Sequence, residues 1–300
     1  MYDIIVVGGG PAGMTAALYG LRNGKTVLVV EKHGFGGQIT YSPKVENYPG
    51  TLQMSGNEFA DRFLEQILAQ GADVELETVT SVETAGDRKI VRTEEGSAFE
   101  GGAVILATGV KHRMLGLPGE NELVGNGISF CAVCDGDFYK DLTVCVAGGG
   151  NSALQEAILL AGKCKKVIML QDLPTFTGEQ RLQDILFAKE NVEAHTNMKI
   201  TGLRQENGAL TAVETTGGDF PCDGLFLAIG LIPENGAFAN IAKCNDHGYF
   251  DSDETCTTAT DGVFVAGDCR SKTVRQVTTA VGDGAVAAIA ACRYLDGGAK

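Results

Sequence analysis

Two cysteines separated by two residues, Cys131 and Cys134, form the most chemically distinctive pattern in the chain. Thiols at this spacing can close a small-ring disulfide and open it again. If the motif begins a helix, the helix dipole and the free N–H groups lower the pKa of one thiol and make it a nucleophile. Asp135 directly follows the pair and is placed to carry protons to and from it. The pattern predicts a redox-active dithiol, and the alternative is a pair of buried free thiols.

The other cysteines and the histidines offer no comparable pattern. The chain has nine Cys, which cannot all be paired within one chain because nine is an odd number. They are also scattered over 300 residues, which argues against the disulfide framework of a small secreted protein. A tetrahedral zinc site needs a second pair of ligands, and the four His are far apart in the sequence. We therefore expect no metal site, and buried free thiols at Cys145, Cys164, Cys222, Cys244, Cys256, Cys269 and Cys292.

A glycine-rich turn near the N-terminus has the spacing of a dinucleotide site. Gly8, Gly10 and Gly13 follow an apolar strand and open a helical pattern, and Glu31 ends the next strand 18 residues later. The glycines permit a tight turn, close approach of a pyrophosphate to the backbone, and close packing of helix on strand. The helix N-terminus would bind the pyrophosphate, and Glu31 would accept both ribose hydroxyls, which a 2′-phosphate would forbid. The predicted site also includes Pro11, Ala12 and Lys32.

The same pattern recurs 140 residues later. Residues 144–157 repeat residues 4–17, with Gly148, Gly150 and Ala153 in place of the three glycines. Further matching pairs are 27–32 with 167–172 and 104–109 with 225–230. The first strand of each unit is continuously apolar, as expected for a parallel strand that is covered on both faces. The sequence therefore predicts an α/β protein with two Rossmann-like, doubly wound domains.

The second domain is predicted to be an insertion in the first. Residues 249–300 contain a strand and turn at 262–268 and an Ala-rich helix at about 276–295, but no partner strand of their own. We expect this segment to return to the first domain, which also contains an amphipathic helix at 58–70. The predicted division is 1–115 with 245–300 for the first domain and 116–244 for the second.

Charge and composition exclude several classes of partner. The chain has 24 basic and 38 acidic residues, and its formal net charge of −14 repels nucleic acid and anionic lipid. No apolar run reaches the roughly 18 residues that a membrane-spanning helix needs. Met1, Tyr2 and Asp3 lead into an apolar strand without a basic region or a cleavage site. We expect a cytoplasmic protein that binds neither nucleic acid nor membrane.

These motifs together resemble the low-molecular-weight thioredoxin reductases of the pyridine nucleotide-disulfide oxidoreductases, over essentially the whole chain. The position of the cysteine pair in the inserted domain separates this group from glutathione and lipoamide reductases. Further matching segments are Gly36-Gly37-Gln38, Val45-Glu46-Asn47-Tyr48-Pro49-Gly50, Ala107-Thr108-Gly109, and Gly267-Asp268 followed by Arg275-Gln276.

The resemblance implies a homodimer in which the first domain holds FAD. Asp268 would face the ribityl and phosphate region, and Arg275-Gln276-Val277 would lie beside the isoalloxazine ring. The residues that the motifs and the resemblance assign to the cofactor are Gly8, Gly10, Pro11, Ala12, Gly13, Glu31, Lys32, Gly37, Gln38, Asn47, Val79, Thr108, Gly109, Asp268, Arg275, Gln276 and Val277.

The resemblance also implies different roles for the two cysteines of the catalytic group, which comprises Cys131, Cys134 and Asp135. Cys134 would contact the flavin, and Cys131 would attack the disulfide of thioredoxin or a thioredoxin-like protein. The inserted domain would rotate about its two linkers, presenting the disulfide to the flavin and the dithiol to thioredoxin in turn. Residues 111–120 and 245–249 contain the Gly, Pro and polar residues expected of such hinges.

The second glycine-rich turn departs from the pattern of NADPH-using relatives. Those relatives carry a His-Arg-Arg run after the second strand of the inserted domain and another Arg beyond it, which clamp the 2′-phosphate. Gln171, Asp172, Leu173 and Thr177 stand at these positions here, so every cation of the clamp is missing. Asp172 could bind the free 2′-hydroxyl of NADH, whereas Pro174 indicates a rebuilt loop.

We therefore expect that NADPH is not the efficient electron donor. A reduced ferredoxin or another low-potential donor is favoured, as in family members that have lost the nicotinamide site, and NADH comes next. Three alternatives remain: an NADPH-dependent thioredoxin reductase, an FAD-containing reductase of the ferredoxin–NADP type, and a disulfide-carrying sensor or binding protein without turnover. The ferredoxin–NADP type lacks a C-x-x-C motif, so Cys131 and Cys134 argue against it.

Overall fold

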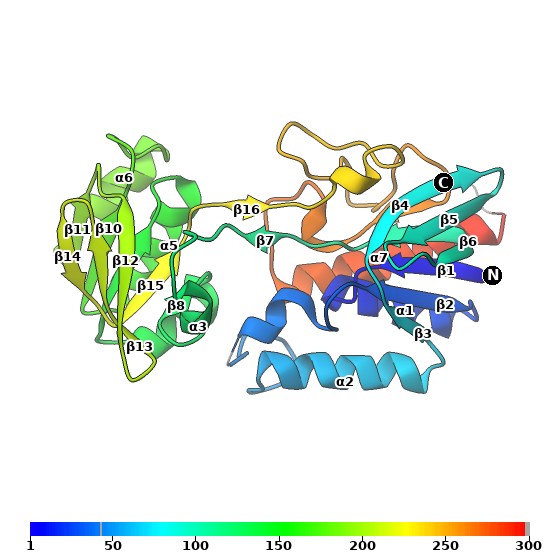
Figure 1. Ribbon diagram of the computed structural model, residues 1–300, viewed down its shortest axis with the longest axis horizontal. Coiled ribbons are helices and arrows are strands. Elements are labelled where there is room, and N and C mark those ends of the chain that lie inside the picture. Colours follow the sequence, from blue (N-terminus) through cyan, green and yellow to red (C-terminus); the bar gives the residue numbers. More distant parts are fainter. Residues whose placement is uncertain (43, 298–300) are drawn as a thin grey trace. The chain divides into compact units, whose positions relative to one another are not determined.

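The computed structural model describes residues 1–42 and 44–297 as two units, each built on a sheet with parallel central strands (Figure 1). The first unit comprises Met1–Lys111 with Ile232–Lys300, and the second comprises His112–Leu231. Residues 298–300, which the sequence places in the first domain, lie outside the described residues. The predicted α/β class with two Rossmann-like units is confirmed.

Within its described residues, the first unit contains seven strands in its sheet, three helices and three short 3-10 segments. The strands are β1 (Tyr2–Val7), β2 (Val27–Glu31), β3 (Asp73–Leu76), β4 (Val79–Ala85), β5 (Arg88–Thr93), β6 (Ala98–Leu106) and β17 (Val263–Val265). The helices are α1 (Pro11–Arg22), α2 (Gly56–Ala69) and α7 (Val277–Leu295), with η1 (Gly37–Tyr41), η3 (Gly236–Phe238) and η4 (Gly267–Cys269). The strand order is β3-β2-β1-β6-β5-β4, and β17 pairs with the end of β6.

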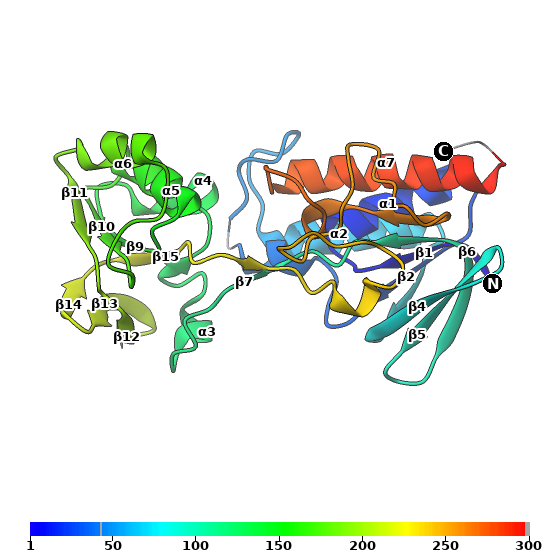
Figure 2. The same cartoon turned by 90° about the horizontal axis from the view of Figure 1, so that it is seen from above.

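The alternation of β1 divides the core of the first unit into two layers. Ile4 and Val6 point to the face that α1 and α7 cover, and these two helices lie side by side in Figure 2. Ile5 and Val7 point to the other face, where Phe250 packs with them. The strand is therefore continuously apolar because both of its faces are buried.

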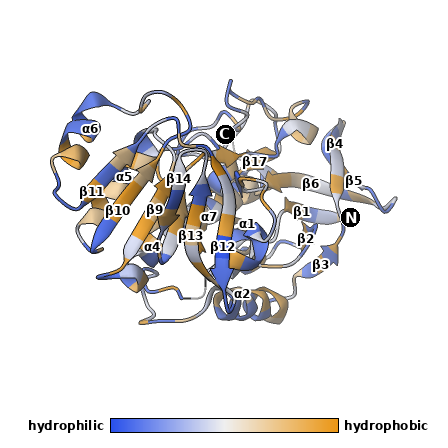
Figure 3. Cartoon of the chain, turned by 60° about the vertical axis from the view of Figure 1, so that its left-hand side comes forward, coloured by the Kyte–Doolittle hydropathy of each residue, from blue (hydrophilic) through white to orange (hydrophobic). Residues whose placement is uncertain are grey.

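The second unit has a five-stranded parallel sheet and a three-stranded antiparallel sheet. The parallel sheet has the order β11-β10-β9-β15-β8, and Figure 3 shows its central strand β9 as largely hydrophobic. Its strands are β8 (Ile128–Ser129), β9 (Thr143–Ala147), β10 (Lys166–Leu170), β11 (Val192–His195) and β15 (Gly224–Leu227). The antiparallel strands are β12 (Ile200–Glu206), β13 (Ala209–Thr215) and β14 (Gly218–Pro221). The helical segments are α3 (Glu120–Leu123), α4 (Ala132–Asp135), η2 (Gly136–Tyr139), α5 (Asn151–Ala161) and α6 (Gln180–Phe187).

The chain crosses between the units at different residues from those predicted. β7 (Lys111–His112) pairs with β16 (Leu231–Ile232), so the chain returns to the first unit at Ile232 rather than at 245. The outward boundary likewise falls at His112 rather than at 116.

The displaced return has a physical cause in the packing of the segment after β16. Phe238, Ile241 and Ala242 are buried in the core of the first unit, although the sequence assigned them to the second domain. The predicted hinge at 245–249 is instead a turn within the first unit, closed by the N–H groups of residues 247 and 249, which donate to the side chain of Asn245.

The predicted helices are present with small shifts at their ends. The patterns at 58–70 and 276–295 correspond to α2 and α7, and the helical patterns that follow the two glycine-rich turns correspond to α1 and α5. Ser55 caps α2 by accepting a hydrogen bond from the N–H of Glu58. Across the described residues, no helix is long and apolar enough to cross a membrane.

Candidate functional site

The two cysteines of the C-x-x-C motif form a disulfide at the start of a short helix. Their Cα atoms are 5.3 Å apart, and Cys131 is the N-cap residue of α4. The backbone N–H of Cys134 donates to Sγ of Cys131 at 3.2 Å. The motif therefore does begin a helix, which is the condition that the sequence argument set for an activated thiol, although α4 is only one turn long. The N–H of Cys134 would stabilise negative charge on Cys131 whenever the disulfide is open.

The neighbouring polar groups hold the motif in place. The hydroxyl of Ser129 donates to Oδ2 of Asp135 at 2.6 Å and accepts from the N–H of Cys131 at 3.2 Å. Burial raises the pKa of the Asp135 carboxyl, and the hydrogen bond from Ser129 partly offsets this effect. A carboxyl whose pKa lies above its usual range is better suited to exchange protons with a thiol.

One side of the motif is exposed and the other is packed. Val133, between the two cysteines, is exposed, as is Phe138. Phe130 stacks on the ring of His112 in β7 at 4.2 Å, and burial lowers the pKa of His112 to about 4, so that this ring is neutral at pH 7. The disulfide thus lies in a segment that carries two exposed apolar side chains, Val133 and Phe138.

Four predicted cofactor segments lie at one edge of the first sheet. Val7 is in register with Val30 and with Leu106, and Leu106 is in register with Val265. The glycine-rich turn, Glu31, the turn at 107–109 and the turn at 267–268 therefore all follow the carboxyl ends of adjacent parallel strands. This edge is where open α/β sheets bind nucleotides.

The first glycine-rich turn has the geometry that its sequence predicts. Gly8 has a φ of +109°, and a Cβ added there would lie 2.3 Å from the carbonyl oxygen of Ala107. A Cβ at Gly13 would lie 1.8 Å from the carbonyl oxygen of Gly8. At Gly10 the nearest atom would be 3.8 Å away, so that the backbone there is open to a ligand. Gly10 is the N-cap of α1, and no acidic residue occupies the first turn of that helix.

Glu31 binds the glycine-rich turn directly. Its Oε2 atom accepts from the N–H of Gly9 at 2.7 Å, and its Oε1 atom accepts from the N–H of His33 at 3.0 Å. Each carboxylate oxygen has a second lone pair for a ribose hydroxyl. A Cβ at Gly37 would lie 3.5 Å from the Cα of Gly10, so this second glycine segment lies beside the first.

The other predicted cofactor residues occupy several places in the first unit. The side-chain amide of Asn47 donates to that of Gln276 at 3.4 Å, across 229 positions of the sequence. Val79 begins β4 three residues after Leu76, the register partner of Glu31. Lys32 forms an ion pair with Glu234 at 2.6 Å. The remaining residues are Pro11 and Ala12 at the start of α1, Gln38 in η1, Thr108 and Gly109 after β6, and Val277 at the start of α7.

Asp268 carries an oxygen without a hydrogen-bond partner. Its Oδ1 atom is buried, and within the described part of the chain no donor reaches it. Gly267 has a φ of +82°, and a Cβ added there would lie 2.8 Å from the Cβ of Ala12. Because Ala12 lies at the start of α1, the next residue, Asp268, is near the start of that helix. Burial raises the pKa of Asp268 to about 6, and the charges of Lys272 and Arg275 counteract this effect. A ligand hydroxyl at this position would satisfy the buried oxygen.

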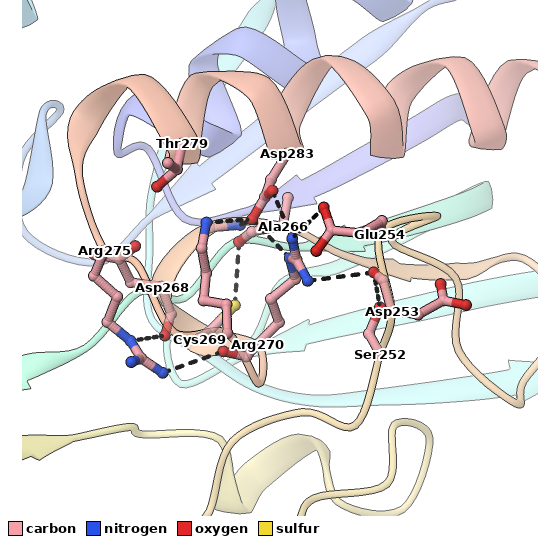
Figure 4. A network of polar contacts seen from close by, with 12 residues as sticks. Ser252, Asp253, Glu254, Ala266, Asp268, Cys269, Arg270, Arg275, Thr279 and Asp283 are labelled. Atoms are coloured by element: carbon pink, nitrogen blue, oxygen red, sulfur yellow. Dashed lines mark hydrogen bonds and ion pairs between the residues drawn. The ribbon is translucent and has the colours of Figure 1, made fainter.

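A buried ion network supports the Asp268 turn, and the sequence analysis missed it. Asp283 in α7 accepts from Arg270 at 2.7 and 2.8 Å, from Lys272 at 2.9 Å and from the N–H of Gly267 at 3.0 Å (Figure 4). Arg275 donates to the carbonyl oxygen of Asp268 at 3.3 Å, so that its guanidinium lies beside the same turn.

Asn235 is a second residue that sequence reasoning missed. It is 1% exposed, and its side-chain NH₂ donates to the carbonyl oxygens of Gly248 and Cys269 at 2.9 Å each. Its Oδ1 atom accepts from the hydroxyl of Thr108 at 2.8 Å. One buried amide thereby joins the turn after β6 to the turn that carries Asp268.

The second glycine-rich turn has the same backbone form as the first. Gly148 has a φ of +123°, and Gly150 is the N-cap of α5. The residues that follow β10 differ from the first unit. Gln171 is 3% exposed, packs over Gly149, and donates to the carbonyl oxygen of Thr175 at 3.2 Å. The N–H groups of Thr177 and Gly178 both donate to the carbonyl oxygen of Gly149, which binds the loop to the turn.

The cysteines outside the disulfide are free thiols, and the possible metal ligands do not cluster in the described residues. In the described residues, no group of three or more His, Cys, Asp or Glu side chains could hold a metal ion. Outside the disulfide, the cysteines are free thiols; Cys244 is half-buried, and the buried ones are Cys145, Cys164, Cys222, Cys256, Cys269 and Cys292.

Comparison with known proteins assigns the family. The family described as pyridine nucleotide-disulphide oxidoreductase matches residues 2–284, and the chain belongs to this family. The chain is 36% identical over 302 residues to a protein named thioredoxin reductase from Bacillus subtilis, covering 99% of this chain and 95% of that protein. It is 38% identical over 302 residues to a thioredoxin reductase from Listeria monocytogenes, covering 99% and 94%. The crystal structure of thioredoxin reductase from Streptococcus pyogenes is 36% identical, with a TM-score of 0.93 and 99% of both chains covered.

Proposed function

We propose that this protein is an FAD-dependent reductase of the disulfide of thioredoxin or a thioredoxin-like protein. The observation that carries the proposal is the Cys131–Cys134 disulfide at the start of α4, with an acidic residue beside it and exposed apolar residues around it. The relatives named thioredoxin reductase match nearly the whole chain and support the same activity.

FAD is the cofactor that the first unit fits best. Gly10 and the start of α1 would hold the pyrophosphate, Glu31 the adenosine ribose, and Asp268 a hydroxyl of the ribityl chain. The open backbone at Gly10 and the unpaired oxygen of Asp268 support this assignment. When bound, FAD supplies a two-electron carrier that can return the disulfide to the dithiol.

The dithiol form of the motif would carry out the exchange with thioredoxin. The Cys131 thiolate attacks one sulfur of the partner disulfide, so that a mixed disulfide forms, and the released partner thiolate takes up a proton. The Cys134 thiolate then attacks Cys131, which re-forms the intramolecular disulfide and releases the second partner thiolate, also protonated. Asp135 carries protons for these steps, and the N–H of Cys134 stabilises the charge on Cys131.

We propose that NADPH is not the efficient electron donor. Gln171, Asp172, Leu173 and Thr177 offer no cation for a 2′-phosphate, and Asp172 adds negative charge. The loss of several charge-assisted hydrogen bonds, at about 1.5–3 kcal/mol each, should lower NADPH affinity by orders of magnitude. The side chain of Gln171 over Gly149 further supports a donor other than a nicotinamide, with a reduced ferredoxin-like protein favoured and NADH next.

The proposed setting is a homodimer in the cytoplasm. Free thiols at the seven other cysteines of the described chain suit a reducing compartment. The homodimer rests on the resemblance to thioredoxin reductases.

The deciding experiment mixes the oxidised protein anaerobically with NADPH, NADH and reduced ferredoxin in separate reactions and follows flavin absorbance. We expect rapid bleaching with reduced ferredoxin, slower bleaching with NADH and little with micromolar NADPH. The same donors are then coupled to reduction of a thioredoxin. Rapid bleaching by micromolar NADPH would refute the proposed donor, whereas no thioredoxin reduction with any donor would refute the reductase and favour the sensor alternative.

A further inference from the structure

Two carboxyl groups without full hydrogen bonding lie behind the redox disulfide. Oδ1 of Asp135 and Oε2 of Glu156 are buried, and neither has a partner in the described residues. Asp135 ends α4, and Glu156 lies on α5, which packs against α4. Buried polar atoms without partners are rare in folded proteins, so a pair of them at a reactive motif calls for a chemical reason.

The carboxyl of Glu156 reaches the backbone of the motif itself. It accepts a hydrogen bond from the N–H of Ala132, the residue that follows Cys131, and it lies close enough to Asp135 for the two charges to repel. Asp135 in turn accepts from the hydroxyl of Ser129 at 2.6 Å. The hydroxyl of Ser129 therefore stabilises the ionised form of Asp135, and each of the two carboxyls keeps one buried oxygen without a partner in the described residues.

Other titratable groups on the elements around α5 are paired or exposed. Lys166 of β10 forms an ion pair with Glu193 at 2.5 Å, and Arg181 and Asp184 of α6 are exposed. Cys145 of β9 is hydrogen-bonded to Cys222. Asp135 is thus the charged group that acts on Glu156.

We propose that Glu156 is a positioning residue that stays protonated beside an ionised Asp135, so that this buried pair holds a single negative charge next to the cysteine motif. The inference rests on the proposed dithiol function and extends it to a residue outside the motif. Two carboxylates in one buried place cannot both ionise at low cost, and Ser129 favours ionisation of Asp135. The proton therefore resides on Glu156.

The pKa shifts of the site agree with a proton on Glu156 and a negative charge on Asp135. Burial raises the pKa of Glu156 to about 8, the charge of Asp135 acts in the same direction, and the N–H of Ala132 opposes both. At pH 7 Glu156 is therefore mostly neutral. Tyr139, in the adjacent segment η2, is neutral as well, because burial raises its pKa to about 12.

A neutral Glu156 favours formation of the nucleophile. When the dithiol loses a proton to become a thiolate, an ionised Glu156 would add a second like charge close to it, whereas a protonated Glu156 adds none. The exchange with thioredoxin transfers two electrons and two protons from the dithiol to the partner, and Glu156 keeps its own proton throughout. Above about pH 8, ionisation of Glu156 opposes thiolate formation.

The internal repeat supports a role specific to the second unit. The 140-residue offset places Glu156 over Ala16 of the first unit, and Ala16 is fully buried. The first unit has no cysteine motif beside its equivalent helix. The carboxyl is present only in the unit that carries the disulfide.

The first test locates the proton in the oxidised, FAD-bound protein, without turnover. Infrared difference spectra between about pH 6 and about pH 10, two units on either side of the expected titration, report the carbonyl band of a protonated carboxyl. We expect a band that disappears at a midpoint near pH 8, is absent from Glu156→Gln, and is unchanged in Glu190→Gln, which removes an exposed carboxylate from the same unit. If the parent protein shows no such band, or Glu156→Gln retains it, the proposal is wrong.

The second test measures the effect on the thiols. The reduced protein is alkylated with iodoacetamide across the same pH range, and the rate at Cys131 is followed by mass spectrometry. The parent and Glu190→Gln should show a broadened titration, because Glu156 and the thiols ionise together. Glu156→Gln should show a single step whose midpoint lies lower by up to about one unit, so that its rate on the rising limb is up to about tenfold higher. Identical profiles would refute the role of Glu156 even if thioredoxin reduction is confirmed, and a failed reductase assay leaves both tests valid.

Discussion

Removal of the Asp283 carboxylate is the sharpest test of the ion network under the Asp268 turn. In the parent protein this group balances the charges of Arg270 and Lys272, whose side chains are 3% and 7% exposed. In Asp283→Ala both cations stay buried. The carboxylate left to face Arg270 is that of Glu254, which is 94% exposed and lies 3.6 Å from Nη2.

The expected cost follows from the burial of the pair. Removal of one partner of a buried ion pair costs about 3–5 kcal/mol, because the other charge is left without compensation. Two cations and the N–H of Gly267 lose their acceptor here. We expect a loss of about 4 kcal/mol in the free energy of unfolding of the first unit.

The pH dependence of this loss has a defined sign. Burial raises the pKa of Asp283, but the hydrogen bonds from Arg270 and Lys272 outweigh burial and leave the pKa below its usual value. A carboxyl with a lowered folded pKa contributes its stability above the unfolded pKa of about 4 and loses it as the pH falls through the folded value. The difference between the parent and Asp283→Ala should therefore be complete at neutral pH and shrink under acid conditions.

Urea denaturation followed by flavin fluorescence and by circular dichroism would measure the effect, since the flavin reports the first unit. The matched control is Glu254→Gln, which removes the exposed partner of the same guanidinium and should change stability by less than about 0.5 kcal/mol. Asp283→Ala should also release FAD at a lower urea concentration, because the Asp268 turn loses its anchor at Gly267. A cost no larger than that of Glu254→Gln would refute the reasoning.

Three further predictions concern the cofactor and the redox pair. The purified protein should be yellow with about one FAD per chain, and Glu31→Arg should lose FAD because a donor replaces the acceptor of the ribose hydroxyls; full occupancy, measured by absorbance, would exclude Glu31 from the site. Cys134→Ser should leave Cys131 able to form a stable mixed disulfide with thioredoxin, detectable on a non-reducing gel, whereas Cys131→Ser should not; normal turnover of either variant would contradict the dithiol mechanism. Because burial raises the pKa of Asp268 to about 6, its ionisation opposes folding of the flavin-free protein, so stability should fall as the pH rises from about 4 to about 6, by about 2–3 kcal/mol in total. Asp268→Asn should remove that fall and weaken FAD binding, and an unchanged pH profile by thermal denaturation would show that Asp268 is solvated.

The parts of the fold that depend on local pattern could be predicted from the sequence. The apolar runs of β1 and β9, the turns at Gly8 and Gly148, and the helices that follow them are encoded within a few residues of one another. The carboxyl-edge position of Glu31 then follows from the parallel order of the strands. The prediction and the structure agree on these features because the local backbone preferences of the residues and their places in the sheet favour the same conformation.

The domain boundary could not be predicted in the same way. The segment between Ile232 and Asn245 is short, carries turn residues, and shows neither helical nor strand periodicity. Its assignment depends on where Phe238 and Ile241 pack, and their partners in β1 and β6 are more than a hundred residues away in the chain. The predicted hinge at 245–249 relied on composition, which identifies a turn but not the unit to which the turn belongs.

The buried polar residues could not be found from local sequence patterns, but the internal repeat would have identified one of them. Nothing local marks Asn235 or Asp283, because their partners at Cys269, Thr108 and Arg270 come from separate turns. Glu156 differs, because the first unit supplies an internal reference. At its equivalent position Ala16 packs in the core, so a carboxyl at this site cannot be required by the fold that both units share. A charged residue that replaces a buried apolar one in only one half of a repeat therefore points to the chemistry that distinguishes that half, and here this half holds the disulfide.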